Sequence, residues 1–316
     1  MKKNLFLLGL LVCSMATMAQ TETANKPESW YFKLGGSYFN QTASTEFPTV
    51  GGNAALDRTY VGGKLVSEES VTGSFGQGFR TGITAGYRFS TRIGVELGIN
   101  YYSSNDKKMA QTTSDLPITP TGVYSFKSVG QITAFDLAPA IVMFLGESKG
   151  FEPYTKVGVL VPVHGDLEIT SDAYAPIAFT PQGAPAAFGN VHSVDKVKPN
   201  PTLGFTAALG TTYKLTSHLS AFAELEYRNF TVHGKTKETT EFTVNGQDAL
   251  ATRTTAQIHT NYRERLDVNS NNALFNPNTA TPDQRDTTRP NEAMDELSSY
   301  VGISGLGLTL GIKYSL

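Results

Sequence analysis

The sequence predicts an all-β protein that folds as an eight-stranded antiparallel up-and-down β-barrel. Eight stretches of the chain alternate apolar residues with small or polar ones, as β-strands do because successive side chains point to opposite faces. The connections between these stretches alternate between long and short along the chain. Short connections join antiparallel neighbours as hairpins. An even number of strands places both termini of the chain at the same end of the barrel.

The first strand is expected at 30–40, where Trp30 and Leu34 share one face and Lys33 lies on the other. A polar connection rich in Thr, Gly and Ser follows at about 41–76. We interpret this connection as the first of four long loops.

The clearest hairpin comes next and joins strands at 79–89 and 93–101 through the turn 90–92. Apolar residues alternate with small ones on both strands, and the turn is too short for any other connection. The small-residue face of this hairpin also carries three charged residues, Arg80, Arg88 and Glu96. The second long loop is expected at about 104–130.

A second hairpin is predicted from strands at 131–145 and 151–163, with the turn at 146–150. Pro139 lacks a backbone N–H and therefore weakens the first of these ladders. The small-residue face again carries charged residues, namely Asp136, Glu152 and Lys156. The third long loop follows at about 164–201.

The third hairpin pairs strands at 202–215 and 219–230 through the turn 216–218. Its polar face carries Lys214, Glu224, Glu226 and Arg228. The fourth and longest loop, at about 231–299, is polar throughout.

The closing strand is expected at 305–316, where Leu and Ile alternate without a break with Gly, Thr and other polar residues. Its end follows the pattern polar-x-Gly-x-x-apolar-x-apolar, formed by Thr309, Gly311, Tyr314 and Leu316. This pattern resembles the closing strand of bacterial outer-membrane β-barrels, although the last residue of that family is usually Phe. The resemblance implies that the barrel-assembly machinery recognises this strand during biogenesis.

Alternation alone fits either a membrane barrel or a secreted lipocalin-like barrel with its apolar face inside. Three features favour lipid outside and hence a transmembrane barrel. The polar face consists mainly of Gly, Thr, Ser and Ala, which suit the narrow interior of an eight-stranded barrel. Strands of about 10–13 residues are long enough to cross a bilayer at a tilt. Aromatic residues lie near both strand ends, as the two girdles of membrane barrels do.

The aromatic residues assigned to the turn end are Trp30, Tyr87, Phe89, Phe144, Phe151, Tyr213 and Tyr314, and those assigned to the loop end are Tyr38, Phe79, Tyr101 and Tyr227.

The inner face is expected to hold charges of both signs, and charges in a narrow lumen must be paired. The strongest candidates for a lumen charge network are Arg80, Arg88, Glu96, Asp136, Lys156, Glu224, Glu226 and Arg228, with Lys33, Glu152, Lys214 and Lys313 on the same face. Two interpretations remain open. The network either plugs the lumen permanently, or it acts as a salt-bridge gate that rearranges into a small pore.

The first residues fit a cleaved signal peptide at 1–19, with Lys2 and Lys3 before an apolar run and small residues at the cleavage site. Residues 20–29 would form a short periplasmic lead. The only cysteine, Cys13, lies in the signal peptide, so the mature chain is expected to contain no disulfide. The net charge of −2 gives no reason to expect a nucleic-acid partner.

The predicted barrel as a whole, 30–316, resembles small outer-membrane barrel domains of the OmpA/OmpX type. The resemblance implies export through the periplasm to the outer membrane of a Gram-negative bacterium, contact with membrane lipid and lipopolysaccharide, and an extracellular ligand at the loops. Because the sequence ends on the closing strand, no peptidoglycan-binding domain is expected.

No motif for catalysis, cofactor binding or metal binding was found, so a non-enzymatic structural and surface-interaction role is the leading interpretation. The first alternative is a small gated ion or solute pore. The second is a lipid-modifying enzyme, because one family of eight-stranded barrels modifies lipid A with a His, a Ser and an acidic residue. His164 and His233 lie near strand ends and would be its candidates.

Overall fold

The computed structural model describes residues 29–118, 122–179, 185–200, 202–272, 275 and 289–316. These residues form nineteen β-strands, seventeen in one sheet and two in another, together with two very short helices. The all-β prediction is confirmed, but the predicted count of eight strands was too low. The predicted signal peptide and most of the lead lie outside the described residues.

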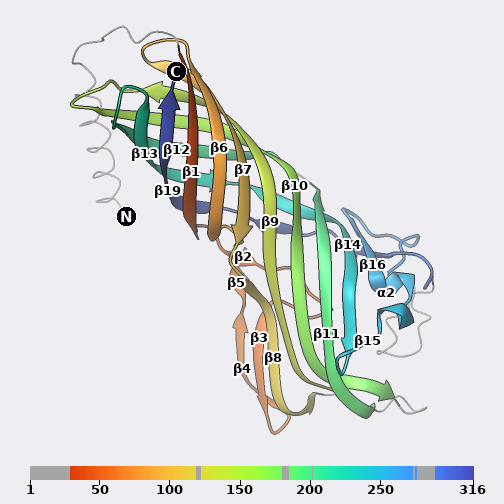
Figure 1. The fold of residues 1–316 in the computed structure, drawn as a ribbon. Helices are drawn as coiled ribbons and strands as arrows, with labels where there is room; N and C mark the ends of the chain where they lie inside the picture. Colours follow the sequence, from red (N-terminus) through yellow and green to blue (C-terminus); the bar gives the residue numbers. More distant parts are fainter. Residues whose placement is uncertain (1–28, 119–121, 180–184, 201, 273–274, 276–288) are drawn as a thin grey trace.

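Eight of the nineteen strands pair with one another in a closed antiparallel ring (Figure 1). Each ring strand pairs with the next ring strand along the chain, and the last pairs back with the first. In order they are β1 (Ser29–Gln41), β6 (Gly78–Arg88), β7 (Ile93–Ser104), β9 (Val123–Phe144), β10 (Phe151–Phe179), β12 (Gly204–Lys214), β13 (Leu219–Asn229) and β19 (Gly305–Ser315).

The ring strands begin and end within a few residues of the predicted positions, with two exceptions. Strand β9 begins at 123 instead of about 131, and β10 ends at 179 instead of about 163. Both strands therefore continue past the loop end of the ring into a second region of structure, as Figure 1 shows. This extension makes the barrel taller on one side than on the other.

The second region is an open sheet, here called the raised sheet, that includes the parts of β9 and β10 beyond the ring. Its strands pair in the order β4–β3–β8–β9–β10–β11–β14–β16–β17. The added strands are β3 (Leu56–Val61), β4 (Lys64–Ser70), β8 (Lys107–Ile118), β11 (Pro185–Asn200), β14 (Thr231–Val244), β16 (His259–Arg263) and β17 (Met294–Leu297).

All four segments predicted as long loops contain strands. Strand β14 illustrates why their alternation is weak. Its sequence is mainly Thr, Lys and Glu, and most of its side chains are exposed or half-buried. A strand without a continuous apolar face gives little alternation, although the β-branched Thr residues favour extended backbone.

The remaining elements are short. Strand β15 (Gln247–Asp248) pairs with β14, β18 (Tyr300–Gly302) also pairs with β14, and β2 (Thr45–Glu46) pairs with β5 (Thr72–Gly73) in the separate small sheet. The helices are the 3-10 helix η1 (Leu250–Thr252) and α2 (Thr255–Ile258). Within the described residues, no helix is long and apolar enough to cross a membrane.

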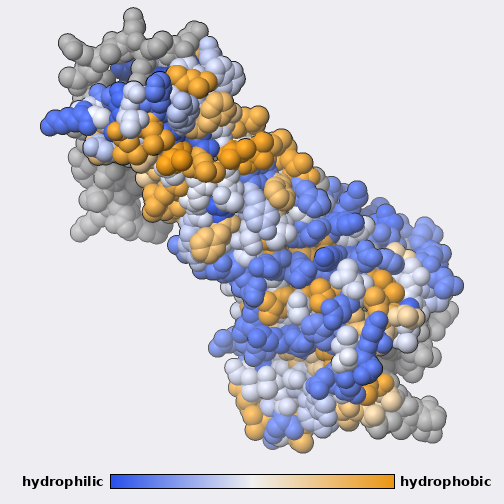
Figure 2. Space-filling view, in the orientation of Figure 1, coloured by the Kyte–Doolittle hydropathy of each residue, from blue (hydrophilic) through white to orange (hydrophobic). Residues whose placement is uncertain are grey.

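The side chains of the ring face the way the sequence indicated. Leu308 is 53% exposed on the outside of the ring, and Ile99 and Val159 are exposed as well. Glu96 is only 4% exposed inside the ring, and Arg88 is buried there too. Figure 2 shows, on the face in view, the resulting apolar band over the ring and the more polar surface of the raised sheet.

The raised sheet has its own apolar core. It contains Phe47, Phe75, Tyr102, Met109, Ile132, Leu160, Ile169, Val197, Phe230 and Ile303, among other buried residues. This core lies directly beyond the loop end of the ring, so the polar lumen and the apolar core are stacked along one axis.

A register shift lets β10 bury opposite faces in the ring and in the raised sheet. In the ring, Val159 faces outward, whereas Ile169, of the same odd parity, is buried in the core of the raised sheet. The pairing of β10 with β9 shifts between Pro162 and His164. An extra residue in a strand turns all following side chains to the opposite face. The shift therefore moves one apolar row from the outside of the ring to the inside of the raised sheet.

Candidate functional site: the charged lumen

All the predicted lumen residues except Lys214 lie inside the ring and form four groups from the turn end to the loop end. Each ring strand places every second side chain inward, so charges distant in sequence meet across the lumen. The groups are Arg88 with Glu152 and Lys313, Lys33 with Glu96, Lys156 and Glu224, Arg80 with Glu226, and Arg228 with Asp136. Together these groups define the lumen charge network.

The central group is a cross-linked set of two lysines and two glutamates. Lys33 Nζ lies 2.6 Å from Glu96 Oε1 and 3.1 Å from Glu224 Oε1. Lys156 Nζ lies 2.7 Å from Glu224 Oε2 and 3.7 Å from Glu96 Oε2. The charges cancel, which offsets the cost of removing four ions from water.

Two tyrosines complete the central group. Tyr31 donates its hydroxyl proton to Glu96 at 3.0 Å, and Tyr154 donates to Glu224 at 2.7 Å. Lys33 Nζ also lies 4.4 Å from the centroid of the Tyr154 ring, within the range of a cation–π contact.

Glycines make room for these rings. A Cβ atom on Gly86 would lie 2.2 Å from the Tyr31 ring, and one on Gly210 would lie 2.5 Å from the Tyr154 ring. The sequence indicated that the inner face is made of small residues, and the structure adds the reason for two of them. The small residues leave space for large aromatic rings that enter from neighbouring strands.

The third group is a paired arginine and glutamate. Both terminal nitrogens of Arg80 contact the carboxylate of Glu226, with Nη1 at 2.6 Å from Oε1. Thr206 also donates its hydroxyl proton to Glu226 at 2.9 Å. A forked arginine–carboxylate pair fixes geometry as well as charge, so this pair ties β6 to β13 across the lumen.

The turn end is closed by Arg88, which binds Glu152 at 2.6 Å and lies 4.0 Å from the centroid of Phe144. Lys313 lies 3.9 Å from the same carboxylate. Phe144 was assigned to the outer aromatic girdle, and that assignment was wrong. It has the same parity as Asp136 on β9 and is therefore buried inside the ring.

The loop end is closed by Arg228, which is completely buried. Its Nη2 atom lies 3.5 Å from Asp136 Oδ2, and Asn100 donates to the other carboxylate oxygen at 2.8 Å. The guanidinium lies over the Tyr102 ring at 4.5 Å, with Phe39 and Phe230 close by. Arg228 thus lies at the boundary between the polar lumen and the apolar core.

The lumen leaves little free space between these groups. A cavity of about 40 Å³ lies among Lys33, Arg80, Glu96, Lys156 and Glu224. A buried water needs about 10–15 Å³ of such space, so the cavity has room for a few waters and none for a larger solute.

The remaining predicted residues occupy more peripheral places. Lys214 is exposed, which corrects its assignment to the lumen, because it ends β12 beside a turn. In the closing strand, Thr309 is buried and hydrogen-bonds to Ser37 at 2.7 Å. Gly311 pairs with Gly35, whereas Tyr314 and Leu316 are exposed on the outside.

Two of the histidines, His233 and His192, form hydrogen bonds with other side chains. His233 Nδ1 lies 3.1 Å from the Ser298 hydroxyl, and His192 Nδ1 lies 2.7 Å from Asp172. His164 lies exposed on β10. Among the described residues, neither contact forms a Ser–His–carboxylate arrangement, and no group of three or more His, Cys, Asp or Glu side chains is placed to hold a metal ion.

Comparison with known proteins agrees with the geometry of the ring. The model of the outer membrane protein beta-barrel domain family matches residues 5–263, well over half of the chain. One similar solved structure is that of the outer membrane protein OprG from Pseudomonas aeruginosa, with 11% identity and a TM-score of 0.41 over 93% of this chain and 98% of that chain. A comparison with curated proteins found no match. The chain belongs to the outer membrane protein beta-barrel domain family.

Proposed function

We propose that this protein is an integral barrel of the outer membrane that serves as a rigid, closed platform and carries the raised sheet outside the cell. The observation that carries this proposal is the exposure pattern of the ring. Most of its large apolar residues face outward, and all of its charged residues except Lys214 face inward, which stabilises a barrel whose outer solvent is lipid. A closed ring also satisfies the backbone hydrogen bonds that lipid cannot satisfy.

Aromatic contacts at the two ends of the ring support a membrane position. Trp30 packs on Tyr87, and Phe151 packs on Tyr213, at the turn end. At the loop end, Tyr38 packs on Phe79 and Tyr101 packs on Phe135. Aromatic girdles at both interfaces are typical of outer-membrane barrels, and lipopolysaccharide and membrane lipid would contact the belt between them.

The raised sheet is the part of the protein that we assign to contacts with molecules outside the cell. It extends from the loop end, where long connections of such barrels face the exterior. Binding residues are often carried on segments held by a rigid scaffold. In the same proposal, β19 with Thr309, Gly311, Tyr314 and Leu316 is the strand that the assembly machinery recognises.

Heat-modifiable gel migration and planar-bilayer conductance test this proposal together. We expect the folded protein to migrate differently before and after boiling, as detergent-resistant barrels do, and to insert into bilayers without stable single-channel steps. A protein that shows no heat shift and is recovered in native form without detergent would contradict the membrane barrel. Stable conductance steps would contradict the closed lumen.

A small gated ion pore is the second candidate, and one observation favours it. Among the described residues, the three guanidinium nitrogens of Arg228 have no hydrogen-bond partner, and its one ion-pair contact is the 3.5 Å approach to Asp136. A pair held this loosely at the loop end is the place where the network could open. If it is a gate, Arg228→Leu would produce conductance in a bilayer in which the wild-type protein is silent.

The lipid-modifying enzyme is the third candidate and rests on the contact between His233 and Ser298. A serine nucleophile needs a base within hydrogen-bond distance, and this pair meets that condition. In the part of the chain that the structure describes, no carboxylate hydrogen-bonds to this histidine. Mass spectrometry of lipid A from cells lacking the gene tests it. Unchanged lipid A would exclude this candidate.

A further inference from the structure

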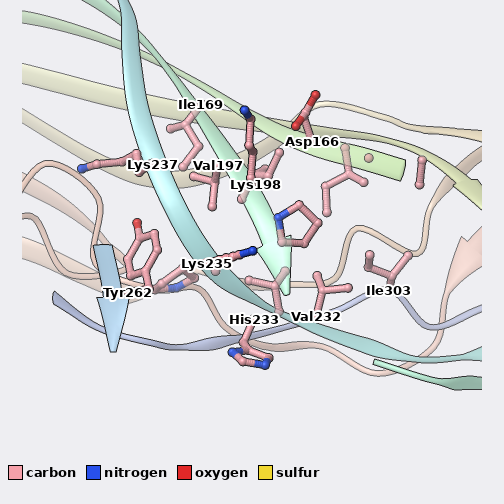
Figure 3. Close-up of a pocket in the computed structure, with 18 of the residues that line it drawn as sticks. Asp166, Ile169, Val197, Lys198, Val232, His233, Lys235, Lys237, Tyr262 and Ile303 are labelled. Carbon is pink, nitrogen blue, oxygen red and sulfur yellow. The ribbon is translucent and has the colours of Figure 1, made fainter. Parts of the chain in front are cut away.

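A cavity of about 420 Å³ lies in the raised sheet, next to the loop end of the ring. It is formed by β9, β10, β11, β14 and β16, together with the segments around Val50 and Val301 (Figure 3). This volume lies in the range of small-molecule sites, about 300–1,000 Å³. The lumen cavity is about ten times smaller, so the two spaces differ in what they can hold.

The inner wall of this cavity is apolar. Ile132, Ile169, Val197, Phe230 and Ile303 line it and also belong to the core of the raised sheet. The cavity is therefore a gap within an apolar core. Packed cores normally leave few voids larger than a water molecule, so a cavity of this size with an apolar wall favours an apolar occupant.

The rim of the cavity is cationic. Lys198, Lys235 and Lys237 line it, and none of them forms an ion pair with a described residue. Figure 3 shows Lys235 reaching toward the middle of the lining side chains. Two carboxylates, Asp166 and Asp195, also line the cavity, and Asp195 accepts a hydrogen bond from Thr239 at 2.6 Å. The lining thus contains three lysines and two aspartates.

Tyr262 adds a neutral donor beside these lysines. Its ring packs so closely on Gly234 that a Cβ atom there would lie 2.6 Å away. Burial raises the pKa of Tyr262, with nearby carboxylates acting in the same direction. The hydroxyl therefore stays protonated and can donate a hydrogen bond.

The strand wall is incomplete beside the cavity. The pairing of β10 with β12 ends at Leu160, and its pairing with β11 begins at Leu167. The residues between them that line the cavity, Pro162 to Asp166, have no partner on that side among the described residues. Pro162 and Pro199 lack the N–H groups that would continue a ladder. This break in the ladder lies beside the cavity and is the candidate entrance for a ligand.

We infer that this cavity binds an amphipathic anion, with an acyl chain against the apolar wall and an acidic head group at Lys235. The inference rests on the proposed role of the raised sheet as the contact region, and it names the chemistry of that contact. The head group is either the carboxylate of a free fatty acid or the phosphate of an acylated lipid, because a lysine ammonium pairs with both.

The experiment uses the full chain in phosphatidylcholine nanodiscs and the fluorescent probe 11-(dansylamino)undecanoate. We expect saturable binding above that of empty nanodiscs. Dodecanoate and dodecyl phosphate should displace the probe, whereas dodecanol and dodecyltrimethylammonium should displace it at least tenfold less well. If dodecanoate is the stronger competitor, the source is a free fatty acid, and if dodecyl phosphate is stronger, the source is a phosphorylated lipid.

Two variants locate the site and one serves as a control. Lys235→Glu should weaken probe binding at least tenfold, because it reverses the charge that meets the head group. Val232→Trp should abolish binding by filling the cavity. Lys64→Glu makes the same charge change on exposed β4, which does not line the cavity, and should leave binding unchanged.

Binding that equals that of empty nanodiscs, or that survives both Lys235→Glu and Val232→Trp, would overturn the inference. So would equal displacement by dodecanol. The heat shift and conductance of every variant are measured in parallel. A closed, heat-modifiable barrel that binds no probe rejects only the inference, whereas a conducting barrel that binds the probe rejects only the closed platform.

Discussion

The ring and the raised sheet share strands but place their apolar residues on opposite sides. Strand β9 shows this within one chain segment, because its even-numbered residues face inward from end to end. In the ring, the inward Asp136 is buried and the outward Ile141 is 63% exposed. In the raised sheet, the inward Ile132 is 4% exposed and the outward Lys127 is exposed.

The difference shows that the alternation itself carries no information on orientation. The period of two is the same in both regions, and only the chemistry of the two faces is exchanged. An apolar outer face is stabilised by lipid, and a polar outer face by water. The position along β9 at which the outward residues change from apolar to polar therefore marks the expected membrane boundary. Four predictions test this comparison, from the largest expected effect to the smallest.

The buried ion pairs of the ring should matter far more than the exposed pairs of the raised sheet. Glu224→Gln leaves Lys33 and Lys156 short of one buried carboxylate, and removing one member of a buried pair costs about 3–5 kcal/mol. The matched change Glu68→Gln breaks an exposed pair with Arg58 and should cost less than about 1 kcal/mol. Urea unfolding in lipid vesicles measures both, and equal costs would contradict a lumen in which the charges are buried.

Isoleucine truncation on β9 should distinguish core from lipid contact. Ile132→Ala opens a cavity in the packed core and should cost about 2–5 kcal/mol. Ile141→Ala removes the same atoms from the outer face, where lipid tails fill the space, so only the transfer term of about 0.8 kcal/mol per methylene remains. The same unfolding assay compares them. A larger cost at Ile141 would place a packed partner on the outside of the ring.

A charge on the outer face should be costly in the ring and harmless on the raised sheet. Leu310→Arg places a guanidinium in the middle of the apolar belt, because Leu310 is exposed and pairs with Gly36 and Ala223, and it should cost about 2–4 kcal/mol near the bilayer centre. Val66→Arg makes a comparable change at an exposed position of β4 and should stay within about 0.5 kcal/mol. Both are read from unfolding in vesicles, and tolerance of Leu310→Arg would argue against lipid at that face.

The smallest effect concerns acid and the outer edge of the raised sheet. Burial alone would raise the pKa of Asp295, but hydrogen bonds from the backbone of Asn271 and the side chain of Arg263 outweigh it and hold that pKa below its usual value. Because the folded pKa is depressed, this stabilisation is complete above the unfolded-state pKa of about 3.9 and is lost as the pH falls through the folded value.

Hydrogen exchange of β16 and β17, corrected for intrinsic rates, checks this prediction. Protection should be constant from pH 7 to about pH 5 and should fall below about pH 4. Asp295→Asn should show low protection at every pH. Loss of protection between pH 7 and pH 5 in the wild-type protein would assign the effect to another group.

Much of the ring could be predicted from the sequence because lipid imposes a simple pattern. The outward Leu308 and the inward Glu96 follow from parity on their own strands. The inward aromatics were harder, since Phe144 looks like a girdle residue until its parity is compared with that of Asp136. Phe222 is inward as well, and the glycines opposite make room for it.

The raised sheet could not be predicted in the same way. Leu167 and Ile169 continue the odd-numbered valine row of β10, and only the shift at Pro162 turns them inward. A register shift depends on pairing with β9, which alternation on one strand does not report. The cavity and its lysines require five strands to be placed side by side, so no local pattern indicated them.

Fluorescence quenching tests most directly whether lipid or water contacts the outer face of the ring. Cys13 is the only cysteine, so a Cys13→Ala chain accepts a fluorophore at a single new cysteine, Leu308→Cys in the ring or Val66→Cys on the raised sheet. In vesicles, we expect brominated acyl chains to quench the label at 308 and aqueous iodide to quench the label at 66. Quenching of the label at 308 by iodide, with no effect of brominated lipid, would contradict the proposal that the outer face of the ring contacts lipid.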